Sequence, residues 1–235
     1  MFLEANSFRD PRGPAPTRKP FARFLSAVFL TMAGGVIVTA AAAEAVAHDS
    51  GLRAMLVTAG ELTLFGWVTL VAPICLVLLI SGGMDRLTSG VARTLFLIYA
   101  VLVGLSLGTV FEFYAGANIA GAFIGAAAGF ASLAFYGLAT RRELSRMGSF
   151  LTIALIGLVV ALFINIFTAS AGFDAVLAMV GAMVFAGLTA WDMQKLKCLH
   201  AEGASDRVAV IGALTLYLDL LNLFLSLLRL TRRRR

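Results

Sequence analysis

Charged residues are scarce in this sequence: they make up 14% of the 235 residues, whereas 60% are hydrophobic. Soluble domains average about 25% charged and about 45–50% apolar residues. The deficit is concentrated in blocks of roughly 20 residues, the length needed to cross a hydrocarbon core of about 30 Å. One such block, 150–168, lacks the polar face of a helix on a soluble protein. The composition therefore argues against a soluble globular protein.

Cysteine and histidine are also rare, with two of each in the chain. Cys75 lies in an apolar block and Cys198 in an expected cytoplasmic loop, so no disulfide framework is predicted. We find no His/Cys metal cluster, no phosphate-binding glycine loop and no Ser/His/Asp set. The sequence thus favours a protein that is not an enzyme and has no cofactor.

The apolar blocks predict an all-α integral membrane protein with seven transmembrane helices. Short connections indicate one compact membrane domain over 24–230, between a disordered basic tail at 1–23 and a basic C-terminal tail at 231–235. The net charge of +6 falls mainly between the blocks, which indicates a lipid bilayer rather than nucleic acid as the partner. The predicted spans are 24–46, 60–81, 92–113, 117–139, 149–169, 174–196 and 209–230.

The distribution of basic residues predicts the orientation. The N-terminal tail and the second, fourth and sixth connections are basic, whereas among the other connections only the first carries a base, Arg53. By the positive-inside rule the N-terminus is cytoplasmic. Seven crossings would place the arginines of 232–235 outside, whereas a re-entrant last segment would keep them in the cytoplasm. The full length of the apolar segment 212–230 favours seven crossings, and the alternative stays open.

Two aspartates are the most informative residues, because an ionised side chain at the membrane centre costs about 2.5–3.5 kcal/mol. Asp219 lies inside the seventh span with Asn222 on the same helical face, and Asp192 lies near the cytoplasmic end of the sixth. Adjacent antiparallel helices bring the two carboxylates together if span six continues past Lys195 and span seven begins near Gly212. Such a pair shares one proton, responds to pH and, when deprotonated, offers hard oxygens for transient Ca²⁺ binding.

Other polar groups near the spans have weaker functional signals. Arg86, at the cytoplasmic end of span two, is a possible gating partner for the pair. Glu61 and Glu112, near the outer ends of spans two and three, are a possible outer mouth for cations, although interfacial acids are common. Asn165 in span five is expected to form a hydrogen bond between helices. A small-residue stripe in span four should let another helix backbone approach closely: Gly121, Gly125 and Gly129.

Two segments resemble the signature of the Bax inhibitor-1 family, the transmembrane Bax-inhibitor-motif proteins. They are Trp-Asp-Met-Gln at 191–194 and Leu-Tyr-Leu-Asp-Leu-Leu-Asn-Leu-Phe at 216–224. The glycine-rich fourth span, the Arg-Arg-Glu-Leu-Ser at 141–145 and the Phe-Ile-Asn-Ile-Phe at 163–167 are similar to the bacterial branch. The resemblance covers roughly 24–230.

The resemblance implies seven helices with the last one central and wrapped by the other six. It also implies a pH-sensitive calcium leak channel, in which the aspartates at 192 and 219 are the pH sensor and latch. Arg86 is the nearest match to the family's span-two arginine, whereas an acidic residue found in span two of some members is missing here, where Val71, Ala72 and Pro73 stand.

Bacterial relatives also include modulators of a membrane-bound AAA protease. The alternative function is therefore an interaction protein that regulates membrane proteolysis or stress survival, with the tail at 1–23 as its docking segment. A third alternative is a secondary transporter, although no inverted repeat is evident. We expect a monomer in the bacterial inner membrane.

Overall fold

The computed structural model describes residues 20–82, 88–114, 118–202 and 205–231, and nearly all of them are helical. The predicted gating arginine, Arg86, and most of both predicted tails lie outside these ranges. The helices are α1 (Phe21–His48), α2 (Ser50–Leu56), α3 (Leu64–Gly82), α4 (Ser89–Phe113), α5 (Ile119–Ala139), α6 (Ser145–Thr168), α7 (Ala171–Ala201) and α8 (Asp206–Thr231). The expected all-α fold is thus confirmed.

Six of the described helices are long and apolar enough to cross a membrane: α1, α4, α5, α6, α7 and α8. A shorter apolar stretch, Leu64–Ile80, corresponds to the predicted second span. Large apolar side chains point outward from the bundle, and only 11% of the residues in the most apolar 18-residue stretch of α6 are buried. Water would not tolerate so much contiguous apolar surface, whereas lipid does. The fold is that of a multi-pass membrane protein.

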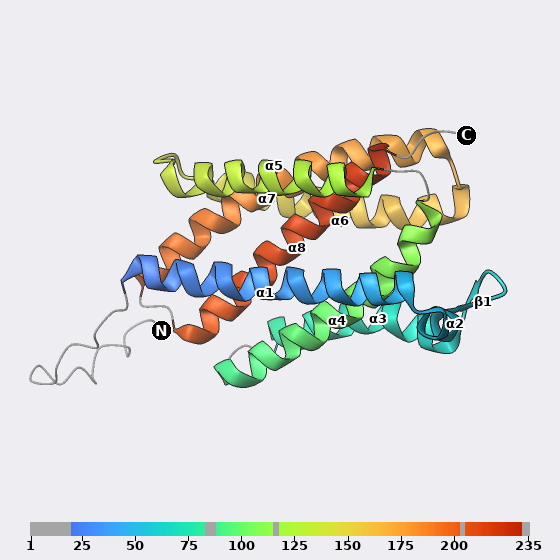
Figure 1. The fold of residues 1–235 in the computed structure, drawn as a ribbon. Coiled ribbons are helices and arrows are strands. Elements are labelled where there is room, and N and C mark those ends of the chain that lie inside the picture. Colours follow the sequence, from blue (N-terminus) through green and yellow to red (C-terminus); the bar gives the residue numbers. More distant parts are fainter. Residues whose placement is uncertain (1–19, 83–87, 115–117, 203–204, 232–235) are drawn as a thin grey trace, which may run out of the picture.

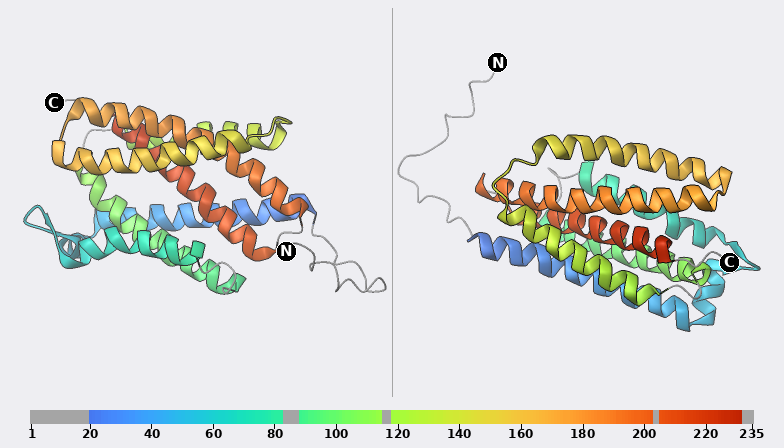
Figure 2. Two further views of the ribbon diagram at one scale, coloured as in Figure 1. Left: turned by 180° about the vertical axis from the view of Figure 1, so that it is seen from behind. Right: turned by 90° about the horizontal axis from the view of Figure 1, so that it is seen from above.

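Helix α8 is the most buried of these helices. In its most apolar 18-residue stretch 67% of the residues are buried, against 39% or less in the others. Figure 1 shows α8 running obliquely between a layer that contains α1, α3 and α4 and a layer that contains α5, α6 and α7. The view from behind in Figure 2 shows the same arrangement. Helix α8 packs mainly against α7, α1, α5 and α4. Its side chains therefore form a large part of the buried core.

The connection between α1 and α3 differs from the prediction. The second span was expected to begin at residue 60, but a short helix, α2, and a two-stranded hairpin, β1 (Val57–Thr58) and β2 (Glu61–Leu62), precede α3. The hairpin turns through Ala59 and Gly60, whose φ angles are 54° and 84°. Positive φ at both central residues gives the strand twist that a two-residue hairpin needs. Glu61 is therefore on an exposed hairpin and not on a membrane helix.

Close contacts between helices occur at glycines other than the predicted stripe. A Cβ atom on Gly125 or Gly129 would lie 3.7–3.8 Å from leucine side chains of α8, an ordinary contact. On Gly137 of α5 it would lie 2.2 Å from the carbonyl oxygen of Ala190 on α7. The expected backbone approach along α5 therefore occurs about two turns beyond the stripe, where α5 meets α7.

Candidate functional site: a buried pair of aspartates

Asp192 of α7 and Asp219 of α8 are both buried, with 7% and 4% of their surfaces exposed. Their side chains lie within hydrogen-bonding reach of each other. Helices α7 and α8 pack against each other along much of their length, as expected for consecutive helices that are joined by a short connection. The structure therefore brings the two predicted acids together away from bulk solvent.

The helix ends explain why the two carboxyl groups meet. Helix α7 continues past Lys195 and Lys197 to Ala201, so Asp192 lies nine residues before its end. Helix α8 begins at Asp206, thirteen residues before Asp219, and not near Gly212 as expected. Of the two conditions for the approach, the continuation of α7 past Lys195 is met, whereas α8 begins before Gly212. The two residues lie on helices that pack side by side along much of their length, although their distances from the helix ends differ.

The hydrogen bonding of the pair constrains its protonation. One oxygen of Asp219, Oδ2, is buried and has no hydrogen-bond partner among the described residues. An ionised carboxylate only accepts hydrogen bonds, so a bond between two carboxyl groups requires a proton on one of them. Two ionised carboxylates in a poorly solvated place would also repel each other strongly. The geometry therefore suits a pair that holds one shared proton.

Lys195 lies one turn after Asp192 on α7. Its Nζ atom lies 5.1 Å from the centroid of the Trp191 ring. Asp192 and Lys195 also line a small cavity of about 90 Å³ together with Leu196 and Thr215. Since one water takes about 30 Å³ in the liquid, this cavity has room for roughly three. A small cavity and a lysine thus lie beside Asp192, towards the end of the bundle where α7 ends.

The neighbours of Asp192 in the sequence hold α7 in place. Trp191 packs so closely on Gly148 of α6 that a Cβ atom there would lie 2.1 Å from its ring. The amide of Gln194 accepts a hydrogen bond from the Leu144 backbone and donates one to the Arg142 carbonyl, each 2.8 Å long. The Trp-Asp-Met-Gln segment therefore positions Asp192 from both sides.

A second buried polar contact fixes α8 two residues before Asp219, and sequence reasoning missed it. The Thr39 hydroxyl of α1 donates to the Ala100 carbonyl of α4 at 3.0 Å and lies 2.5 Å from the Tyr217 hydroxyl. Because Thr39 donates its single hydroxyl proton to the Ala100 carbonyl, Tyr217 must be the donor in the bond between the two hydroxyls. The only signals in the sequence were a threonine and a tyrosine within apolar helices, and nothing in the sequence showed that the two are partners.

The remaining predicted site residues lie elsewhere. Asn165 accepts a 3.3 Å hydrogen bond from Thr168 at the end of its own helix, not the expected bond between helices. Asn222 donates to the Leu218 carbonyl at 2.8 Å and lines a cavity between α3, α4 and α8 that does not include Asp219. Glu61 is exposed on β2, and the side chain of Glu112, in the last turn of α4, lies outside the described part of the structure.

The pair alone is a poor resident metal site. Ca²⁺ takes six to eight oxygen ligands, whereas two carboxylates offer at most four. Among the described residues no group of three or more His, Cys, Asp or Glu side chains is placed to hold a metal ion. A deprotonated pair fits a passing cation with part of its hydration shell better than a fixed one.

Comparisons with known proteins agree with this architecture. The family model described as "Inhibitor of apoptosis-promoting Bax1" matches residues 22–235. The inner membrane protein YbhL of Escherichia coli is 35% identical over 240 residues, which cover 100% of this chain and 99% of YbhL. An uncharacterized protein of Deinococcus radiodurans is 37% identical over 88% of this chain and 89% of its own length. In Rickettsia prowazekii the uncharacterized protein RP147 is 34% identical over 91% of this chain and 90% of its own. The chain belongs to the Bax inhibitor family of membrane proteins.

Proposed function

We propose that this protein is a pH-sensitive cation leak channel, with Ca²⁺ as the permeant ion and Asp192 and Asp219 as its sensor. The observation that carries the proposal is the burial of two carboxyl groups within hydrogen-bonding reach, one of them with an unpartnered oxygen. Buried ionisable groups inside a membrane bundle are expensive and commonly mark ion or proton pathways.

The mechanism follows from the shared proton. With one proton on the pair, the hydrogen bond joins α7 to α8 and the bundle is closed. When the proton leaves, two like charges face each other, and at 4 Å their repulsion is about 4 kcal/mol in an effective dielectric of about 20. Separation of α8 from α7, a turn of Asp192 towards Lys195, or entry of a cation relieves this repulsion. Each of these changes opens or occupies the space beside Asp219.

The proposal includes a topology. We place α3 as the second of seven crossings, with α8 at the centre, the N-terminus in the cytoplasm and the protein in the inner membrane. Helix α1 begins and α8 ends at opposite ends of the bundle, which supports an odd number of crossings over a re-entrant last segment (Figure 1). The basic connections and the inner-membrane relative YbhL support the orientation and location.

The test is Ca²⁺ flux into proteoliposomes, measured against pH for the wild type and Asp219→Asn. Asparagine has nearly the same shape and cannot ionise, so we expect flux that no longer changes with pH. Asp174→Asn is the matched control, because Asp174 is in the first turn of the same helix as Asp192 and at its other end. No flux in the wild type, or an unchanged pH profile in Asp219→Asn, contradicts the proposal.

A further inference from the structure

A second, larger cavity lies between α3, α4 and α8; it is lined by residues on either side of Asp219 but not by Asp219 itself. Its volume is about 270 Å³, just below the roughly 300 Å³ at which small-molecule pockets begin. The walls are mostly apolar, with Leu70 of α3, Val103 of α4 and Leu225 of α8 among them. Leu70 is 43% exposed on the outside of the bundle, so this wall is partly open towards the surroundings. An apolar occupant that arrives from the membrane fits such a space.

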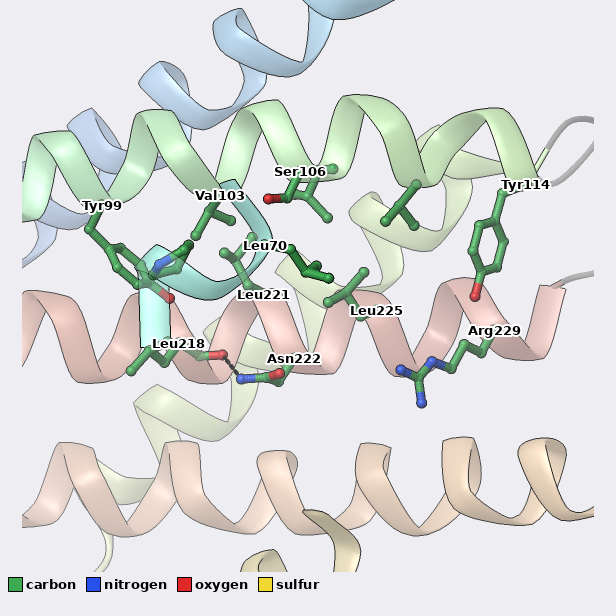
Figure 3. Close-up of a pocket in the computed structure, with 13 residues that line it drawn as sticks. Leu70, Tyr99, Val103, Ser106, Tyr114, Leu218, Leu221, Asn222, Leu225 and Arg229 are labelled. Atoms are coloured by element: carbon green, nitrogen blue, oxygen red, sulfur yellow. Dashed lines mark hydrogen bonds between the residues drawn. The ribbon is translucent and has the colours of Figure 1, made fainter. Parts of the chain in front are cut away.

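The cavity has a charged end. Arg229, in the last turn of α8, is the one formally charged residue in its lining, and Tyr114 lies at the same end (Figure 3). The opposite end is formed by Tyr99 and Leu218 (Figure 3). A half-buried guanidinium favours an anionic partner, and no carboxylate among the described residues lies within ion-pairing distance of it. This end of the cavity therefore favours an anion over a cation.

The length of the cavity matches half a membrane. Leu218 and Arg229 are eleven residues apart on α8, and at 1.5 Å per residue they are separated by about 16 Å. Half of a hydrocarbon core of about 30 Å is about 15 Å. The charged end lies where α8 ends, at the level at which helix ends and lipid headgroups meet. The apolar part extends inward to the middle of the bilayer.

From these three features we infer that this cavity binds an anionic phospholipid of the leaflet in which α8 ends. The phosphate accepts hydrogen bonds from the Arg229 guanidinium, and one acyl chain lies along Leu225, Val103 and Leu70 towards Leu218. A helix-end arginine that merely extends to the membrane surface would show no preference for one lipid. Selectivity for an anionic headgroup is therefore what separates the two interpretations.

The test counts lipids bound to the full-length, purified protein by native mass spectrometry. Phosphatidylglycerol and phosphatidylcholine with identical acyl chains are compared, with inorganic phosphate as a competitor. We expect phosphatidylglycerol to bind preferentially, and Arg229→Gln to weaken it roughly tenfold, the effect of losing one charge-assisted hydrogen bond. Arg93→Gln is the control, because Arg93 is exposed near the start of α4, at the opposite end of that helix from Tyr114, and should leave binding unchanged.

A second variant tests the apolar part. Val103→Phe fills the cavity and should reduce phosphatidylglycerol binding although Arg229 is intact. Circular dichroism first confirms that both variants keep the helix content of the wild type. Equal binding of the two lipids, equal effects of Arg229→Gln and Arg93→Gln, undiminished binding to Val103→Phe, or displacement of the lipid by inorganic phosphate overturns the inference.

Discussion

The hydroxyl of Tyr217 on α8 lies 2.5 Å from the hydroxyl of Thr39 on α1, although 178 residues separate them in the chain. Tyr217 is fully buried and also packs edge-on against Phe96, with ring centroids 5.4 Å apart. This contact holds α8 to α1 and α4 immediately before Asp219. On its other side α8 packs against α7, where Asp192 and Asp219 lie within hydrogen-bonding reach. In the proposed mechanism this second contact depends on a proton, whereas the contact between Tyr217 and Thr39 does not.

Tyr217→Phe should lower the melting temperature of the purified protein by roughly 2–4 °C. The change removes one buried hydrogen bond, worth about 1 kcal/mol, and keeps the ring packing. Thr39 retains its bond to Ala100, so the loss is confined to one contact. Tyr136→Phe is the control because Tyr136 is 48% exposed on α5. Equal melting temperatures for Tyr217→Phe and the wild type would show that the contact contributes nothing to stability.

Gly137→Ala and Gly157→Ala should change stability in opposite directions. A methyl group on Gly137 would lie 2.2 Å from the Ala190 carbonyl oxygen, so α5 and α7 must separate at a cost of about 1–3 kcal/mol. Nothing lies within 4 Å of the same position on Gly157, where alanine should stabilise the helix by about 0.5–1 kcal/mol. Thermal unfolding in one detergent measures both, and a stabilising Gly137→Ala would disprove the packing at this crossing.

Lys195→Met should move the pH of half-maximal Ca²⁺ flux upward. Lys195 lines the same cavity as Asp192, and removal of a positive charge beside an acid makes loss of the acid's proton less favourable. Because the channel is proposed to open on deprotonation, its pH profile shifts to higher pH. Lys197→Met is the control, since the Lys197 amine is exposed and donates to the Leu138 carbonyl at 3.0 Å. A shift to lower pH, or equal shifts in both variants, would refute this role.

Deletion of residues 2–19 separates the channel from the alternative proposal of a protein that modulates a membrane-bound AAA protease. This segment carries four of the five basic residues of the predicted tail. If the tail is a docking segment, its deletion abolishes co-purification of the protease while the pH profile of Ca²⁺ flux is unchanged. Undiminished co-purification excludes the tail as the docking segment.

The aspartate pair could be predicted from sequence because an acid in an apolar block needs a partner, and the adjoining helix offered one. The depth of the pair in the bundle was harder to predict, because lysines commonly mark the end of a membrane helix and α7 continues past two of them. Lys195 lies against Trp191 and Lys197 reaches a carbonyl of α5, so neither charge stops the helix. The helix end is thus decided by side-chain contacts that hydropathy does not record.

Other features depend on how helices cross, which a single sequence does not reveal. The contact between Thr39 and Tyr217 requires α1 and α8 to be neighbours, and the lipid cavity requires Arg229 to face α4. The hairpin at 57–62 was missed because residues 60–62 were assigned to the start of the second span. For the two contacts of α8, the partner lies in a distant part of the chain.

The most direct test of the shared proton is infrared difference spectroscopy of the full-length protein in lipid, recorded against pH beside Ca²⁺ flux. The account predicts a protonated carboxyl band that vanishes over the pH range in which flux rises, and that is changed by Asp192→Asn and by Asp219→Asn but not by Asp174→Asn. A band that is absent at every pH, or that disappears without any change in flux, would contradict it.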